Sequence, residues 1–136
     1  MVPVIRARGD DVQARSGIGV TSDLDPELPR IGDDAELAIF RAAQESLANV
    51  VRHAGANRVH LTLGVEGDSV VLIVRDDGRG FPADGNLATF ERAGHLGLIG
   101  MRERIAALGG TVTVDGSDGV TVRVRIPVRQ PSGGGR

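Results

Sequence analysis

The run from Ser69 to Val74 is apolar at nearly every position and ends abruptly in the sequence Arg75-Asp76-Asp77-Gly78-Arg79-Gly80-Phe81. A strand without polar alternation is buried on both faces, so it lies inside a sheet and not at an edge. Aspartate and glycine are ordinary residues of surface turns. Glycine also lets backbone approach a ligand where a Cβ would collide. The chain must therefore build a sheet around this run, and the turn that follows is either a surface turn or the wall of a binding site.

The strands expected beside this run alternate between apolar and polar residues, which is typical of a sheet with one buried face. Val59, Leu61, Leu63 and Val65 alternate with polar residues, and the turn 66–68 leads from that strand into the central run. Two further strands, 111–115 and 120–128, are joined by the hairpin connection 115–119, and 18–24 is a short edge strand. We therefore expect a mixed sheet of about five strands.

A long helix is predicted over residues 34–54, with its core stripe formed by Leu37, Phe40, Gln44, Leu47, Val51 and Ala54. The opposite side carries Ala38, Ala42, Glu45, Asn49, Arg52 and His53. This side is either a solvated face or part of a site. Its alanines leave room for a neighbour, and Glu45, Asn49 and His53 form a line at i, i+4 and i+8. A second helix starts at Gly97, with apolar positions Leu98, Met101, Ile105 and Leu108, and stops at Gly109-Gly110.

The order of elements predicts a single domain built as a two-layer α/β sandwich, with two helices covering one face of the sheet. Residues 1–17 show no sustained period and are predicted to be a lead-in segment, whereas 18–128 form the domain. Within it, 82–96 is a long loop without a clear period. The Pro/Ser/Gly tail 129–136 is predicted to be disordered.

The amino-acid composition narrows the classes of function that the chain could have. The net charge is −2 although sixteen residues are basic, so the balance gives no general case for nucleic-acid binding. Neither Trp nor Tyr occurs, so aromatic stacking is not a main recognition device. No charged-then-apolar leader and no apolar run of membrane-spanning length is present in the sequence, so we expect a soluble piece.

Three separate segments carry residues that suit a nucleotide and a metal. The long helix offers Glu45 and Asn49, and the central strand ends in Asp76 followed by Gly78 and Gly80. A glycine-rich loop runs into the second helix, whose free N–H groups and dipole favour phosphate. An amide oxygen facing phosphate is a reasonable Mg²⁺ ligand, and a fixed carboxylate can accept a hydrogen bond from an exocyclic amino group such as that of adenine. The chemistry predicts an ATP–Mg²⁺ site.

These segments resemble the motifs of the GHKL ATPase superfamily, which has the Bergerat fold. Residues 44–54 (QESLANVVRHA) resemble its N box, Asp76–Phe81 its G1 box, and Gly94–Leu98 (GHLGL) its G2 box. The run 97–104 (GLIGMRER) is similar to sensor histidine kinases of the class that pairs with LuxR/NarL-type response regulators. The resemblance covers roughly residues 17–128, nearly all of the expected folded chain.

The resemblance implies a role for each matching position. Asn49 would hold Mg²⁺, Asp76 would accept from the adenine amino group, and 82–96 would be a mobile ATP lid. Glu45 either activates water or supports the metal site without touching the metal, and we favour the second role. The remaining positions that the resemblance assigns to ATP binding are Arg52, His53, Gly78, Gly80, Phe81, Gly94, His95, Leu96, Gly97, Leu98 and Gly100.

The function implied is the ATP-binding catalytic domain of a two-component histidine kinase, which donates the γ-phosphoryl to a His on a separate dimerisation domain. None of His53, His60 and His95 lies in an acid-rich amphipathic helix, so the isolated chain is expected to bind ATP, as a monomer, without phosphorylating itself. It would be a cytoplasmic domain, with membrane anchoring of the parent protein left open. Val120 replaces a Thr common in the family, which puts a hydroxyl contact there in doubt.

The alternatives are an anti-sigma-factor-type serine kinase and a nucleotide-binding module without turnover. A gyrase- or MutL-like ATPase is disfavoured because the chain contains no Lys to sense phosphate.

Overall fold

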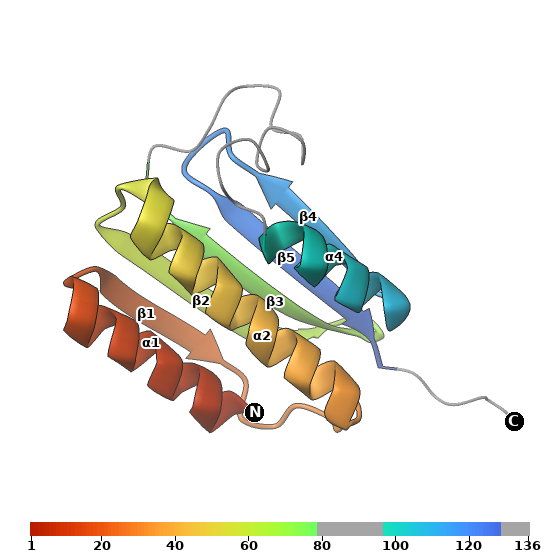
Figure 1. Ribbon diagram of the computed structural model, residues 1–136. Helices are drawn as coiled ribbons and strands as arrows, with labels where there is room; N and C mark the ends of the chain where they lie inside the picture. Colours follow the sequence, from red (N-terminus) through yellow and green to blue (C-terminus); the bar gives the residue numbers. More distant parts are fainter. Residues whose placement is uncertain (79–96, 129–136) are drawn as a thin grey trace, which may run out of the picture.

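The computed structural model describes residues 1–78 and 97–128, without the side chains of His53 and Ala54. A mixed five-stranded sheet, in the order β1-β2-β3-β5-β4, forms one layer. The helices form the other layer and lie on a single face of the sheet (Figure 1). The strands are β1 (Gly19–Leu24), β2 (Arg58–Glu66), β3 (Ser69–Asp76), β4 (Thr111–Asp115) and β5 (Thr121–Pro127). The helices are α1 (Val2–Ser16), α2 (Asp33–Asn49), the π-helix η1 (Val50–Ala54) and α4 (Gly97–Ala107).

The apolar run becomes β3, the middle strand of the sheet, as its composition predicted. It pairs antiparallel with β2 through a turn at Gly67, where φ is 60°, and antiparallel with β5 on its other side. β1 pairs parallel with β2 and forms one edge, and β4 pairs antiparallel with β5 and forms the other. The predicted two-layer α/β sandwich with a mixed five-stranded sheet is confirmed.

Helix α2 begins and ends close to the prediction, but its buried face is different. Leu37 and Val51, which the sequence placed in the core, are 50% and 48% exposed. The face on the sheet instead repeats at three and four residues and combines four alanines and a serine with three larger aliphatic residues, namely Ala35, Ala38, Ile39, Ala42, Ala43, Ser46, Leu47 and Val50. Alanines let the central helix lie close to the sheet, so Ala38 and Ala42 fill the core and are not the open face that was predicted.

Residues 2–16 form helix α1, although no regular element was predicted there. Pro3 stands in its first turn, and Gly17 ends it at φ 78°, where its N–H donates to the Gln13 carbonyl oxygen at 3.0 Å. The helix buries only Ile5 and Gly9, and a Cβ at Gly9 would lie 3.1 Å from Val20 Cγ1. Two buried positions leave no periodic signal, which is why the sequence gave no indication of this helix.

The last turn of the long helix is π-helical, from Val50 to Ala54, and Gly55 ends it at φ 62°. A π turn takes more residues per turn than an α turn, so it shifts the direction of the side chains that follow. Val51, in this turn, is 48% exposed, although the predicted stripe placed it in the core. The predicted helix 34–54 is confirmed in extent, but its final turn follows a different period.

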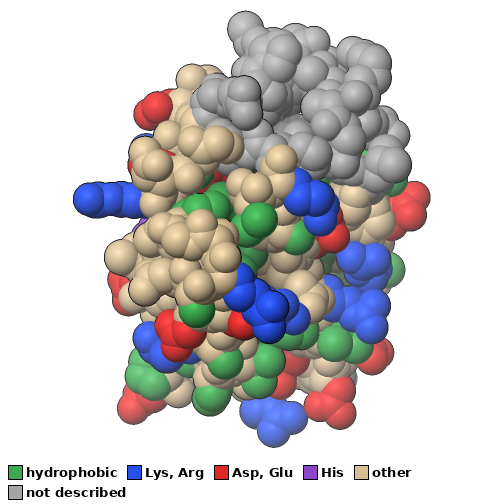
Figure 2. Space-filling view, turned by 60° about the vertical axis from the view of Figure 1, so that its left-hand side comes forward, with side chains coloured by type: hydrophobic (Ala, Val, Ile, Leu, Met, Phe, Trp, Pro, Cys, Tyr) green, Lys and Arg blue, Asp and Glu red, His purple; other side chains and the backbone are tan. Residues whose placement is uncertain are grey.

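The sheet face away from the helices carries arginines from β5, which form ion pairs with Glu66 of β2. Charged side chains of both signs are interspersed over the side of the molecule in Figure 2.

Within residues 1–78 and 97–128, no helix has the length and hydropathy needed to cross a membrane. The predicted lid 82–96 and the predicted tail 129–136 lie outside the described residues.

Candidate functional site

The C-terminal ends of α2–η1 and β3 and the N-terminal end of α4 meet at one end of the molecule (Figure 1). This arrangement follows from the topology. β3 runs antiparallel to β2 and therefore brings Asp76 back beside the residue that starts β2, with Asp76 opposite Val59. Three of the segments that the sequence assigned to one site are thus neighbours in space.

Asp76 is the last residue of β3 and is only 4% exposed. Its Oδ1 accepts the Gly78 N–H at 2.7 Å and the Val120 N–H at 3.3 Å, and its own N–H donates to the Val120 carbonyl oxygen at 3.0 Å. Burial raises the pKa of this carboxyl, the two hydrogen bonds to main-chain N–H groups oppose the rise, and the charge of Asp77 adds to it. Among the described residues, both bonds to the Asp76 side chain end on Oδ1, which leaves Oδ2 as the atom to accept from a ligand.

Asp77 has a separate, structural role. Its Oδ1 accepts the N–H groups of Asn57 and Arg58, each at 2.9 Å, and its own N–H donates to the Arg58 carbonyl oxygen at 3.2 Å. These hydrogen bonds, led by the one from Arg58, lower the pKa of the exposed Asp77 carboxyl. The two neighbouring acids thus have different roles. Asp77 bonds the end of β3 to the start of β2, and Asp76 remains available to a ligand.

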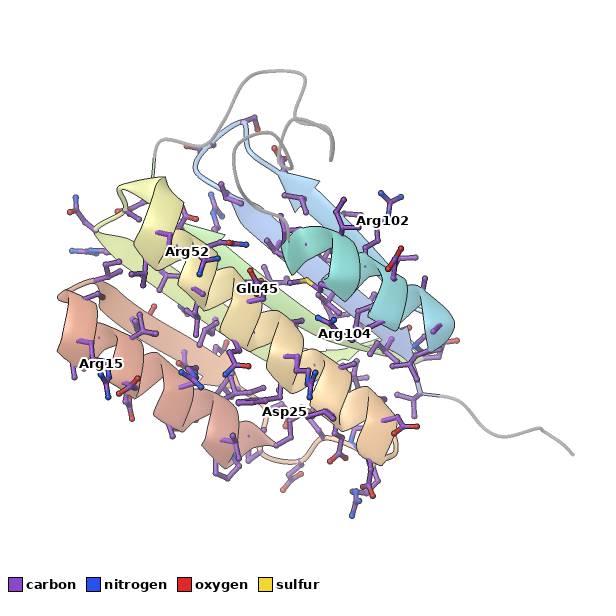
Figure 3. The ribbon with its side chains drawn as sticks, viewed as in Figure 1. Arg15, Asp25, Glu45, Arg52, Arg102 and Arg104 are labelled. Carbon is purple, nitrogen blue, oxygen red and sulfur yellow. The ribbon has the colours of Figure 1, made fainter. Side chains whose placement is uncertain are left out.

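The polar edge of the long helix is brought together by Arg52. Its Nη2 donates to Asn49 Oδ1 at 3.0 Å and to Glu45 Oε2 at 3.4 Å. Asn49 is 8% exposed, and its buried Nδ2 has no hydrogen-bond partner within the described part of the chain. Glu45 and Arg52 project from turns of the same continuous helix (Figure 3). An amide oxygen and a carboxylate that already hold a cation form a donor set that suits Mg²⁺.

Helix α4 begins against this edge. A Cβ on Gly97, its first residue, would overlap the carboxylate of Glu45, so any other residue there would force that carboxylate to move. Leu98 is 1% exposed, and its side chain belongs to the core. A Cβ on Gly100 would meet only the Arg104 guanidinium, at 3.2 Å, which is the far end of a flexible side chain. Any ligand contact of Gly97, Leu98 and Gly100 would therefore be made by their main chain.

Some of the predicted site residues cannot be placed. The His53 side chain and the ATP-binding predictions at Gly80, Phe81, Gly94, His95 and Leu96 lie outside the described part of the chain. The sequence also missed the support that the β4–β5 connection gives to Asp76. A Cβ on Gly119, where φ is 69°, would collide with the Asp76 carbonyl. The Asp118-Gly119 pair was a visible turn signal, but nothing local indicated what the turn would touch.

Comparison with protein families matches residues 34–130 to the family described as histidine kinase-, DNA gyrase B-, and HSP90-like ATPase. Among curated proteins, the chain is 36% identical over 113 residues to the signal transduction histidine-protein kinase/phosphatase UhpB of Salmonella typhimurium, covering 82% of this chain and 21% of UhpB. It is 34% identical over 129 residues to the sensor histidine kinase NarS of Mycobacterium tuberculosis, covering 94% of this chain and 29% of NarS. The chain thus spans between a fifth and a third of the length of these relatives.

Solved structures show the same fold. The catalytic domain of the histidine kinase ThkA superimposes with a TM-score of 0.76 at 21% identity, covering 92% of this chain and 90% of that domain. The mycobacterial sensor histidine kinase MprB superimposes with a TM-score of 0.74 at 24% identity, covering 93% of each chain. At these identities the likeness concerns the fold, and the case for the site rests on the residues described above.

Proposed function

The chain belongs to the histidine kinase-, DNA gyrase B-, and HSP90-like ATPase family, and from that premise we propose that it is the ATP-binding catalytic domain of a two-component sensor histidine kinase. The observation that carries the proposal is Asp76, a buried carboxylate whose Oδ1 is held by main-chain N–H groups while Oδ2 can accept from a ligand. Asp76 is the last residue of β3, whose C-terminal end lies at the same end of the molecule as the C-terminal end of α2–η1 and the start of α4 (Figure 1).

Each residue has a distinct task in this proposal. Asp76 accepts a hydrogen bond from the adenine amino group, and Gly78 keeps the backbone beside it free of a Cβ. Asn49 Oδ1 is the protein ligand for Mg²⁺, which when bound would neutralise charge on the phosphates. The main chain at the start of α4 faces the phosphates, where a helix N-terminus favours negative charge. Glu45 packs against Gly97 and bonds to Arg52, which supports a positioning role in preference to water activation.

The reaction asks little covalent work of these residues. An imidazole nitrogen of the partner domain's His attacks the γ-phosphorus, a P–N bond forms, the bond to the β-phosphate oxygen breaks, and ADP leaves. The protein contributes position and charge neutralisation. The partner would be a histidine-containing dimerisation domain, and a response regulator of the LuxR/NarL type would then receive the phosphoryl group.

Two measurements test the proposal in order. Calorimetric titration of the chain with ATP and Mg²⁺ should give saturable 1:1 binding. Mixing the chain with the histidine hairpin domain of a related kinase and radiolabelled ATP should then give phosphoprotein that is stable in base and labile in acid. Acid-stable phosphate on a serine would instead indicate a serine kinase. Binding without any transfer would indicate a nucleotide-binding module.

A further inference from the structure

A cation already lies on the oxygens proposed for the metal. Arg52 Nη2 bonds to Asn49 Oδ1 at 3.0 Å and to Glu45 Oε2 at 3.4 Å. The side chains of Arg52 and Glu45 are 52% and 28% exposed, so the guanidinium reaches inward from solvent to a nearly buried amide. A half-exposed ion pair of this kind is weak, so Arg52 can leave without unfolding its surroundings.

The negative partner of this cation lies where phosphate is proposed to lie. Glu45 packs against Gly97, the first residue of α4, so closely that a Cβ there would displace the carboxylate. The start of a helix favours negative charge, and a carboxylate there takes the position that an anionic ligand would take. Arg52 and Glu45 together therefore occupy, from within the chain, the positions of both charges of a metal–phosphate unit.

The Asn49 amide is only partly satisfied by the described residues. Its Oδ1 accepts from Arg52, but its buried Nδ2 has no hydrogen-bond partner among residues 1–78 and 97–128. A buried donor without an acceptor costs free energy. The same amide would gain if its oxygen bound a metal ion whose coordinated water or phosphate could accept from Nδ2.

We propose that Arg52 is a displaceable internal cation that competes with the divalent metal ion for Asn49 Oδ1. The proposal rests on the nucleotide site proposed above and adds a regulated step to it: the metal enters only when Arg52 swings out. Arg52 acts on the site by holding Asn49 and Glu45, so it is a positioning residue. The strength of a half-exposed pair predicts that removing this competition tightens metal binding about two- to fivefold.

The test uses Mn²⁺ alone as the probe, with no nucleotide, and follows broadening of the Asn49 side-chain amide resonance. Arg52→Gln should reach half-broadening at about two- to fivefold lower Mn²⁺ than the wild type. Arg41→Gln is the matched control, because it removes the same charge from an exposed position on the same helix. The Gln13 amide on α1 should stay sharp in all three proteins, which separates binding at Asn49 from general broadening.

Unchanged or weaker Mn²⁺ binding by Arg52→Gln would overturn the proposal, as would equal tightening in Arg41→Gln. A parallel titration with adenosine, which carries neither phosphate nor metal, should give the same affinity in wild type and Arg52→Gln. A changed adenosine affinity would mean that the substitution deformed the site, which also counts against the proposal. Calorimetry with ATP and Mg²⁺ on the wild type tests the nucleotide function separately, so its failure is distinguishable from failure of the competition.

Discussion

Two adjacent carboxylates, Asp76 and Asp77, show how one residue's surroundings decide its task. Asp76 is buried, and its pKa is raised by that burial. Asp77 is exposed, and its pKa is lowered by main-chain N–H groups of β2. A raised pKa means that ionisation costs the folded protein stability, whereas a lowered pKa means that ionisation contributes to stability. The first arrangement suits a ligand group, and the second suits a structural anchor.

Substituting Asp76 should weaken ATP binding without lowering the stability of the fold. Asp76→Asn removes a charge-assisted acceptor worth about 1.5–3 kcal/mol, which should weaken ATP binding roughly ten- to a hundredfold. Because the raised pKa makes stability fall as pH rises through it, the uncharged amide should be at least as stable as wild type at pH 7. Calorimetry and urea unfolding measure the two effects. Unchanged affinity in a folded variant would remove Asp76 from the adenine site.

Asp77 should stabilise the fold near neutral pH and lose this effect in acid. Its lowered pKa makes it stabilising above its unfolded pKa of about 3.9, and this contribution is lost as pH falls through the lower folded value. Asp77→Asn should therefore be less stable than wild type at pH 6, and this difference in stability should shrink as pH falls below about 3.9 in urea unfolding. Asp10→Asn, at an exposed position of α1, controls for loss of charge alone. A stability difference between wild type and Asp77→Asn that does not change with pH would contradict the role of Asp77 as a structural anchor.

At the scale of elements, the β4–β5 connection supports the site from across the sheet. Gly119 lies so close to the Asp76 carbonyl that a Cβ would collide with it, and its φ of 69° already favours glycine. Val120 then supplies the N–H and the carbonyl oxygen that bond to Asp76. The position where the sequence lacked an expected hydroxyl thus contacts Asp76 through its main chain.

Gly119→Ala should therefore damage both stability and binding. Backbone strain alone costs about 1–3 kcal/mol, and the collision with Asp76 adds to it and displaces the carboxylate. Gly67→Ala is the matched control, since φ is 60° there but no atom lies within 4 Å of the added Cβ. It should lose about 1–2 kcal/mol and keep its ATP affinity. Equal losses in the two variants, by urea unfolding, would argue against the contact with Asp76.

Two substitutions in α2 test which face of this helix is buried. Ala42 is fully buried and Leu37 is half exposed. Enlarging a packed position usually costs about 1–3 kcal/mol, so Ala42→Leu should destabilise the fold by that amount. Leu37→Ala should cost about 1 kcal/mol or less, because only part of its surface is buried. Thermal or urea unfolding compares them. A larger loss of stability in Leu37→Ala than in Ala42→Leu would instead support the predicted core stripe that contains Leu37.

At the scale of the whole molecule, α1 is part of the helical layer and covers β1 (Figure 1). It reaches the sheet through Gly9, and it buries Ile5 completely. The Gln13 side chain also accepts the Val20 N–H of β1 at 2.8 Å, which satisfies part of an edge strand. The first sixteen residues therefore complete the sandwich over its β1 edge.

Ile5→Ala should show how much α1 contributes. Truncating a fully buried isoleucine costs about 2–5 kcal/mol, whereas Val4→Ala, at a residue that is 52% exposed, should have little effect. Urea unfolding should show one cooperative transition that moves to lower denaturant in Ile5→Ala. A variant as stable as wild type would mean that α1 is a dispensable addition to the fold.

What the sequence determined by itself was local. The apolar run predicted the central strand β3, alternation predicted its neighbours, and the glycine-led pattern at Gly97 predicted α4, because strand and helix periods are written in consecutive residues. The motifs of the N and G1 boxes indicated the family.

Tertiary structure alone decided how those pieces meet. Gly97, the first residue of α4, meets the Glu45 side chain of a different helix, α2. Gly119 supports Asp76 from a hairpin 43 positions further along the chain. Each is a contact between surfaces whose approach depends on how the helices pack on the sheet. A single chain's residue order records the periods of its elements, but not the distances between them.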